Sequence, residues 1–466
     1  MAARLVRETG MTSVERRAAV SLAAIFSFRM LGLFMILPVF MLHAADYAGA
    51  TPALMGVAIG AYGMTQAFLQ IPFGLLSDRL GRKPVIAFGL LLFAAGSALA
   101  AMADTIGLVI AGRALQGAGA VAAAIMALAA DLTRDEHRTK VMAVIGMSIG
   151  LSFSVALVAG PVLDASLGIA GIFWLTAVLA LLGILLLFTV VPTPVRSVVH
   201  RDAEPVPAQF AQVLKDAQLL RLDYGILTLH MILTASFVAL PLVLQQRLQL
   251  PVAHHWWIYL PVLLASVLAM VPFVIQAEKH RRMKPVFLLA IAMVALGELG
   301  LAEFSASLTG VVVSLFAFYV GFNILEATLP SLISRTAPPQ SKGTAMGFYS
   351  SAQFFGAFLG GSIGGWVMGH GGEEAVFLFA AALAALWLLI AAGMQTPRFL
   401  SNRLVSLGET EGLDAAELAR CLGEVPGVVE AVIIAEEGVA YLKVDTRELD
   451  EAALEAAVAR IGQPAD

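Results

Sequence analysis

Twelve apolar runs, each about as long as a bilayer is thick, constrain this chain more than any other feature. A helix needs roughly 20 apolar residues to cross a membrane. The runs lie at 19–42, 53–76, 84–103, 106–130, 141–163, 167–191, 223–245, 256–276, 285–305, 309–333, 343–368 and 374–394. Hydrophobic residues make up 59% of the 466 residues and charged residues 13%, against about 45–50% and about 25% in soluble domains. This excludes a cytosolic enzyme and a secreted disulfide scaffold, and predicts an all-α membrane protein of twelve transmembrane helices.

Loop charges predict the orientation. If the N-terminus is cytoplasmic, nearly all Lys and Arg residues of the loops lie on the inner side, and the outer loops hold only Arg247. Such an excess of positive charge is typical of cytoplasmic loops. We therefore expect both termini in the cytoplasm.

The longest loop divides six spans from six and sets the domain organisation. We expect a cytoplasmic segment at 1–18, a six-helix bundle at 19–191, a linker at 192–222, a second six-helix bundle at 223–396 and a cytoplasmic domain at 397–466. Apolar residues from Phe210 to Leu220 have helical spacing, which favours a short amphipathic helix in the linker over a plain connection.

The segment after Pro397 is polar and acidic, although the rest of the chain has a net positive charge. We expect strands at 404–407, 428–435 and 438–444 and helices at 414–422 and 449–461, with Asp414 as a helix N-cap. The order β-α-β-β-α predicts a small ferredoxin-like α+β domain. Metal-binding domains of this fold use a Cys-x-x-Cys pair, but the chain has one cysteine, Cys421, so we expect no metal site.

The loop between spans two and three carries the most specific motif, Gly74-Leu-Leu-Ser-Asp-Arg-Leu-Gly-Arg-Lys-Pro84. It resembles the signature G-x-x-x-D-R-x-G-R-K of the major facilitator superfamily. The resemblance implies a conformational latch, in which Asp78 faces the start of span eleven and Arg82 pairs with an acid at the end of span four, here Asp131. The latch residues are Gly74, Asp78, Arg79, Gly81, Arg82, Lys83 and Asp131. The alternative is a loop that only sets the membrane topology. Residues 278–282 form a degenerate copy of the motif in the second half.

Span five carries small residues at four-residue spacing, which let helices pack closely in a bilayer. Its end resembles the motif G-P-x-x-G-G of the superfamily's proton-linked exporters, with Gly160 and Pro161 in place. Asp164 stands where the next glycine would be, so the match is partial. We expect Gly150, Gly160 and Pro161 to serve helix packing or antiport, with generic packing as the alternative, also for the glycines of spans two and eleven.

Polar residues inside spans are costly and point to function. They occur on spans one, four, seven and ten, which line the central cavity in the superfamily: Arg29, Arg113, His230, Asn323 and Glu326. Arg113 begins a run that resembles the superfamily's R-x-x-Q-G motif, which is linked to proton coupling. We expect these five residues to form a proton or substrate site. The alternatives are an Arg113 that bonds backbone carbonyls, a packing role for His230, and a fixed pair of Glu326 with Arg29 or a lysine; Glu298, on span nine, is expected to line the outer mouth.

Nearly the whole chain resembles the YajR-type transporters, which are twelve-span members of the superfamily with a ferredoxin-like tail. The runs 26–32 and 323–327 carry this similarity. It implies proton-coupled efflux of small amphipathic compounds by alternating access in a bacterial inner membrane. The expected partners are lipid, a small-molecule substrate and protons, with no nucleic acid, no cofactor and no enzymatic activity, and with a regulatory contact between the tail and the inner loops. Uptake of a solute and a membrane sensor are the alternatives.

Overall fold

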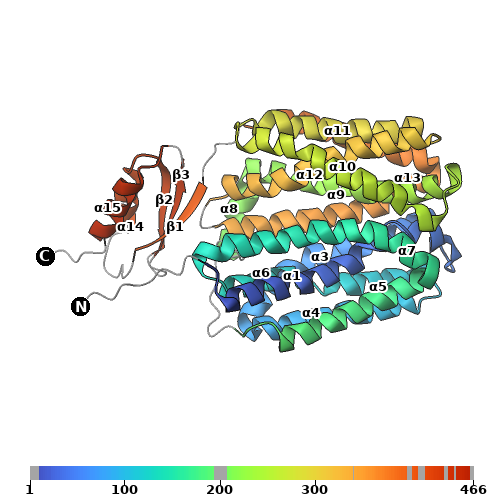
Figure 1. The fold of residues 1–466 in the computed structure, drawn as a ribbon, viewed down its shortest axis with the longest axis horizontal. Helices are drawn as coiled ribbons and strands as arrows, with labels where there is room; N and C mark the ends of the chain where they lie inside the picture. The colour runs from blue at the N-terminus through green and yellow to red at the C-terminus, as the bar shows by residue number, and fades with distance from the viewer. Residues whose placement is uncertain are drawn as a thin grey trace.

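The computed structural model describes residues 10–193, 207–338, 341–395, 401–407, 415–434, 439–445 and 448–461. The helices form one bundle, and the C-terminal strands and helices lie beyond one end of it (Figure 1). We call this end the tail side and the opposite end the far side. The expected N-cap Asp414 lies outside the described residues.

The first half of the bundle contains α1 (Ser13–Phe34), α2 (Phe40–His43), η1 (Ala44–Asp46), α3 (Pro52–Leu80), α4 (Arg82–Ala101), α5 (Ile106–Ala118), α6 (Ala122–Asp131) and α7 (Asp135–Thr189). The second half contains η2 (Pro207–Gln209), α8 (Phe210–Lys215), α9 (Ala217–Leu242), η3 (Val243–Arg247), η4 (Val252–His254), α10 (Trp256–Glu278), α11 (Met283–Phe304), α12 (Leu308–Thr336) and α13 (Lys342–Ala392).

Within the described residues, ten helices are long and apolar enough to cross a membrane, and two of them each hold two of the predicted spans. α7 and α13 are 55 and 51 residues long, and each is broken by a glycine in a left-handed conformation, Gly168 (φ 64°) and Gly372 (φ 70°). Glycine adopts this conformation without the clash of a Cβ atom. Eight helices that each hold one span and two that each hold two spans confirm the prediction of twelve spans.

Two local features were not predicted. Span four occupies the expected range, Ile106–Asp131, but is interrupted: α5 ends at Ala118 and α6 begins at Ala122, where a Cβ on Gly119 would lie 2.2 Å from the Gly89 carbonyl oxygen. The amphipathic helix that begins at Phe210 ends at Lys215, because Asp216 caps the next helix by accepting bonds from the first backbone amides of α9.

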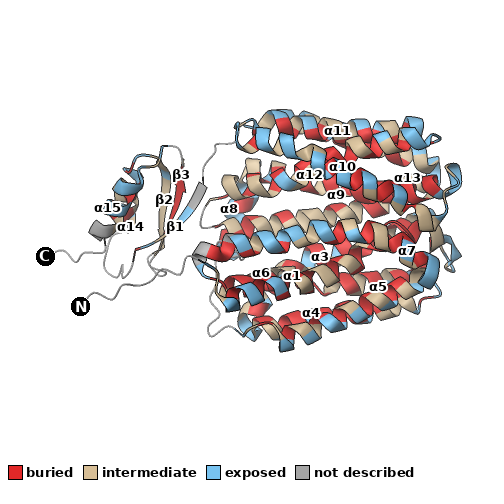
Figure 2. Cartoon of the chain, in the orientation of Figure 1, coloured by how far each residue is buried: buried red, intermediate tan, exposed pale blue. Residues whose placement is uncertain are grey.

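Exposed residues lie on the outward faces of the helices, whereas buried residues concentrate between the helices (Figure 2). Leu268 and Leu389 are each 74% exposed, and Met147 is 68% exposed. A soluble protein seldom exposes so many large apolar residues on contiguous faces. This surface is suited to contact with lipid chains.

The C-terminal region is a small α+β unit, as predicted. β1 (Ser401–Ser406), β2 (Val428–Ile434) and β3 (Val439–Val444) form an antiparallel sheet in the order β1-β3-β2, with α14 (Ala415–Gly423) and α15 (Glu451–Ile461). Leu442 of β3 is fully buried in the core with residues of both helices. The helices cover the face of the sheet that points away from the bundle (Figure 1).

Candidate functional site

Arg82 is the centre of a buried charged cluster on the tail side of the first half. Its guanidinium donates to Asp131 at the end of α6 (Nε to Oδ2, 3.1 Å), to the Ser77 hydroxyl (2.8 Å) and to Asp78. The side chains of Arg82 and Asp131 are 2% and 0% exposed. Removing one partner of a buried ion pair costs about 3–5 kcal/mol. The cluster therefore holds the ends of α3, α4 and α6 together.

The other residues of the motif surround this cluster. Gly81 joins α3 to α4 with a φ of 93°, a conformation that favours glycine. Lys83 donates to the Val191 carbonyl (2.6 Å) and so caps the end of α7. A Cβ on Gly74 would lie 3.0 Å from a side chain of α6, so the two helices pack closely there. Arg79 is exposed.

The second half repeats this arrangement with the charges exchanged. Glu278, at the end of α10, pairs with Arg335 in the last turn of α12 and accepts a bond from Ser331 (3.1 Å). Here the acid stands after span eight and the base on span ten, whereas in the first half the base follows span two and the acid ends span four. The side chains of Glu278 and Arg335 are also more exposed, at 35% and 24%.

Two buried arginines meet in the middle of the first half. Arg29 of α1 and Arg113 of α5 approach the ring of Tyr62, with guanidinium carbons 5.5 and 5.4 Å from its centre. Arg29 donates to Gln66, and Arg113 donates to Gln116 (2.8 Å) and to two carbonyls of α3 (3.3 and 3.4 Å). In the described part of the chain no carboxylate pairs with either arginine, and two guanidinium nitrogens of Arg29 have no hydrogen-bond partner. We call these five residues the arginine core.

The second half holds a different polar group. His230 Nε2 of α9 lies 2.8 Å from the amide nitrogen of Gln353 and 3.6 Å from Glu326 Oε1 of α12. Since the amide donates, the imidazole accepts at Nε2 and is neutral. Glu326 Oε1 is buried without a hydrogen-bond partner among the described residues. We call His230, Glu326 and Gln353 the carboxylate core.

The structure thus separates the predicted proton or substrate site into two cores. Arg29 and Arg113 share one, and His230 and Glu326 share the other. Glu326 lies near His230 and, among the described residues, forms no ion pair with Arg29 or a lysine. The amide of Asn323 donates to Ser266 (2.9 Å) and belongs to neither.

Aromatic rings connect the two halves near these cores. Tyr62 of the arginine core meets Phe354 of α13 at 6.1 Å between ring centres. In the same way Phe322 of α12 lies 6.1 Å from His230 and 6.2 Å from Phe153 of α7. Rings therefore occupy the boundary that a conformational change between the halves must rearrange.

The predicted packing residues of span five behave differently from one another. A Cβ on Gly160 would lie 2.6 Å from the Met35 carbonyl, so this glycine permits close contact with the end of α1. Pro161 follows inside α7. Gly150 is exposed, and a Cβ there would meet no atom within 4 Å. Gly150 is therefore not a close-packing position in this structure.

Span eleven uses its glycines on two faces. Gly361 lies against α3, where a Cβ would come within 2.5 Å of the Gly56 carbonyl, and Gly365 packs there as well. Gly360 lies against α9, with a Cβ placed 2.2 Å from the Met231 carbonyl. One face therefore packs on the other half of the bundle and one on the same half.

Several buried polar residues were not predicted as site members. Asp223 of α9 and Tyr349 of α13 each have a buried oxygen without a hydrogen-bond partner in the described ranges. Asp223 is the first residue of an apolar run, where a carboxylate usually faces water. For this reason the sequence did not identify it as a buried site residue. Glu298 is fully buried and accepts from Ser236 (2.6 Å), so it does not line an open mouth.

Glu15 shows a further tail-side contact that the sequence did not reveal. Its carboxylate accepts from the side chain and the backbone amide of Arg134, all at 3.0 Å, and caps the start of α1 together with Thr12. The pair joins the first helix to the start of α7.

Comparison with protein families gives two matches. The model of the Major Facilitator Superfamily matches residues 22–276 and 236–406, and the model of the YajR YAM domain matches residues 410–460. The chain is 46% identical over 448 residues to the inner membrane transport protein YajR of Escherichia coli (strain K12), covering 96% of this chain and 98% of that protein.

More distant proteins are similar over a smaller share of the chain. The multidrug resistance protein MdtH of Aeromonas salmonicida is 27% identical, covering 77% of this chain and 87% of that protein. Among solved structures, a bacterial homologue of the human lysosomal transporter Spinster, inward-facing and occupied, has a TM-score of 0.67 at 12% identity, covering 82% of this chain and 96% of that one. At this identity the likeness concerns the fold alone.

Proposed function

The chain belongs to the Major Facilitator Superfamily, and from this premise we propose that it exports small amphipathic compounds in exchange for protons. It is an integral inner membrane protein and a secondary transporter, not an enzyme. In our proposal the tail side faces the cytoplasm, the two halves alternate access to a central site, and the proton gradient supplies the energy without a cofactor.

The contact of His230 with Glu326 carries this proposal. A buried carboxyl group can change its charge near neutral pH, and the neutral imidazole beside it does not hold it ionised, whereas an arginine stays charged under nearly all conditions. Glu326 has a buried oxygen without a hydrogen-bond partner among the described residues, which a bound proton would satisfy by donation. The carboxylate core is therefore our proposed proton site.

The arginine core supports a different role. Arg29 and Arg113 keep a fixed positive charge next to the ring of Tyr62. This charge stabilises the ionised form of Glu326 when the halves approach. We propose that the arginines favour release of the proton in one state of the cycle.

The charged cluster at Arg82 acts as the conformational latch in this proposal. It joins three helix ends of the first half, and such charged contacts can hold one state and break in another. Asp131 provides the buried end of the latch. Arg79 is exposed and is assigned no contact in it.

Proton movement in sealed vesicles tests the function. Purified protein is reconstituted with a pH-sensitive dye inside, and a fluorescent lipophilic cation is added from a panel of amphipathic compounds. We expect substrate-dependent proton movement in the wild type, none in Glu326→Gln, and wild-type movement in Glu303→Gln, a matched change of an exposed carboxylate on α11. Equal proton movement in wild type and Glu326→Gln would contradict the proposal.

Contacts between the tail and the bundle favour a regulatory role as a second candidate. Arg281, between α10 and α11, pairs with Asp445 at the end of β3 (3.0 Å), and Lys443 Nζ lies 3.5 Å from the Thr336 carbonyl. We propose that this contact modulates transport. The variants Arg281→Asp and Asp445→Arg are each expected to change the transport rate, and the double variant to restore it; a double variant no closer to wild type than the single ones would argue against the contact.

A further inference from the structure

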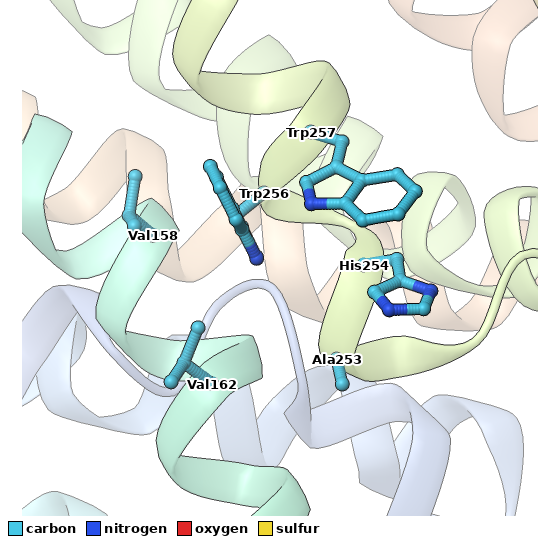
Figure 3. A pocket seen from close by; sticks show the side chains of 6 residues that line it. All are labelled: Val158, Val162, Ala253, His254, Trp256 and Trp257. Carbon is cyan, nitrogen blue, oxygen red and sulfur yellow. The ribbon is translucent and has the colours of Figure 1, made fainter.

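The two halves meet on the far side at a seam between α7 and α10. Val158 and Val162 of α7 face His254, Trp256 and Trp257 across a pocket of about 470 Å³ (Figure 3). The ring of His254 stacks on Trp257, with centres 4.1 Å apart. The seam is therefore mostly apolar at the surface.

An ion pair lies next to this seam. His43, the last residue of α2, bonds Asp164 of α7 (Nε2 to Oδ2, 2.8 Å), and their side chains are 34% and 4% exposed. Asp164 is the residue that stands in place of glycine after Gly160-Pro161. The departure from the glycine motif thus places a carboxylate on α7 where it ties the end of span one to span five.

Asp164 also has an unused acceptor atom. Its Oδ1 atom is buried without a hydrogen-bond partner among the described residues, and so is Nδ1 of His255, the fully buried residue just before α10. The short helix η4, which immediately precedes His255, packs on α7, although no direct bond joins His255 and Asp164 in this structure. Two unsatisfied groups of complementary chemistry therefore lie on opposite sides of the boundary between the halves.

The tautomer of His255 decides what they can do. Its Nε2 atom lies 3.1 Å from the Leu250 carbonyl. A carbonyl only accepts, so Nε2 carries the hydrogen, and a neutral His255 has a lone pair at Nδ1. A neutral ring cannot donate to Asp164 from Nδ1, whereas a protonated ring can.

We propose that His43, Asp164 and His255 form a proton-binding site on the far side, and that protonation of His255 joins the two halves there through Asp164. The proton binds to Nδ1 of His255, and the new N–H donates to Oδ1 of Asp164. Oδ2 keeps its bond to His43. The halves are then held closed on this side, which the loop charges predict to be the outer side.

The charges around the site determine the sign of its pH dependence. The bond to Asp164 raises the pKa of His43 above its ordinary value of 6.5, against the effect of burial, and the charge of Asp46 adds to the rise. The ring of His255 packs with the edge of the Tyr259 ring. Protonated His255 can bond Asp164 only when the halves are closed, so proton binding and closure stabilise each other, and this stabilisation is lost as pH rises. The lock should therefore hold in acid and open in alkaline medium.

A distance measurement tests the lock without any substrate, so its result does not depend on proton-coupled transport. Spin labels are attached to Leu167→Cys and Gln246→Cys, two exposed far-side positions on different halves, in full-length protein that carries Cys421→Ser. Pulsed electron resonance in lipid nanodiscs then gives the distance between the halves at about pH 5.5 and about pH 8, the range in which histidine titrates.

We expect the short-distance population to dominate at the lower pH and to fall severalfold at the higher pH. His255→Gln should show the high-pH distribution at both values, whereas His254→Gln, the matched control, should keep the wild-type response. Asp164→Asn removes the acceptor and should also abolish the response. A wild type without a pH response, or a response that persists in His255→Gln or Asp164→Asn, would overturn the proposal.

Discussion

The two halves of the bundle place charged residues of opposite sign at equivalent positions. On the tail side, the first half pairs a base after span two with an acid on span four, and the second half pairs an acid after span eight with a base on span ten. In the middle, the first half buries Arg29 and Arg113, whereas the second half places Glu326 beside His230. The halves share a plan but differ in the sign of the charge.

This difference shows where a proton can act. Arginine does not lose its proton in proteins, so the arginine core has a fixed charge. A carboxyl group and an imidazole can both change charge when their surroundings change. A cycle driven by protons therefore needs the second half to change state, while the first half supplies a constant field.

The largest effect is expected for the ion pairs on the tail side of the two halves. Arg82→Ala removes the guanidinium that pairs with the buried Asp131 and should cost about 3–5 kcal/mol of stability, because this pair is almost fully enclosed. Arg335→Ala breaks the equivalent but more exposed pair and should cost about 0–1 kcal/mol. Thermal unfolding in detergent measures both. Equal losses would mean that burial does not distinguish the two pairs.

The next effect compares the amide partners of the two cores. Gln66→Leu removes the hydrogen-bond partner of Arg29 and should cost about 1–3 kcal/mol, because a buried charge loses its acceptor. Gln353→Leu removes a bond to a neutral imidazole and should cost about 0.5–1.5 kcal/mol. The unfolding temperature should therefore fall more for Gln66→Leu. The reverse order would indicate that His230 is charged.

Much of this architecture was predictable, because length and apolarity alone specify a membrane span. The twelve spans, the β-α-β-β-α order of the tail and the pairing of Arg82 with Asp131 agree with the sequence-based predictions. The break in span four was not predictable, since it depends on the close approach of Gly119 to a carbonyl of the neighbouring helix.

The division of the polar residues into two cores was also hidden in the sequence. Periodicity places a residue on a helix face but does not say which neighbour it meets. Arg29 and Glu326 both lie on predicted cavity-lining spans, and only the tertiary packing assigns Gln66 to one and His230 to the other. For the same reason the sequence did not distinguish Gly160, which contacts α1, from Gly150, which contacts nothing within 4 Å of a Cβ position.

The contact between α3 and α13, which joins the two halves, gives a third test. Gly60→Ala places a methyl group 2.7 Å from the Phe358 carbonyl, which should cost about 1–3 kcal/mol or push the halves apart. Gly150→Ala adds the same methyl group in open space and should be neutral or stabilise the helix by about 0.5–1 kcal/mol. Unfolding temperatures and transport rates should both separate the two variants. Loss of transport in Gly150→Ala would point to a role other than packing.

The smallest expected effect concerns the second-half loop and the tail. In the first half, Arg82 of the motif pairs with Asp131 inside the bundle. In the degenerate copy of the second half, Arg281 pairs instead with Asp445 of the tail. Both groups are partly exposed, so Arg281→Ala should cost about 0–1 kcal/mol. Hydrogen exchange of the β3 amides should rise by a few-fold at most, with no change in α11, and the neighbouring exposed Arg282→Ala serves as the control. If Arg282→Ala loosened β3 as much as Arg281→Ala, the general charge of the loop, rather than the pair with Asp445, would hold the tail. If only Arg281→Ala did so, the second half would use its motif copy for docking where the first half uses its motif as a latch.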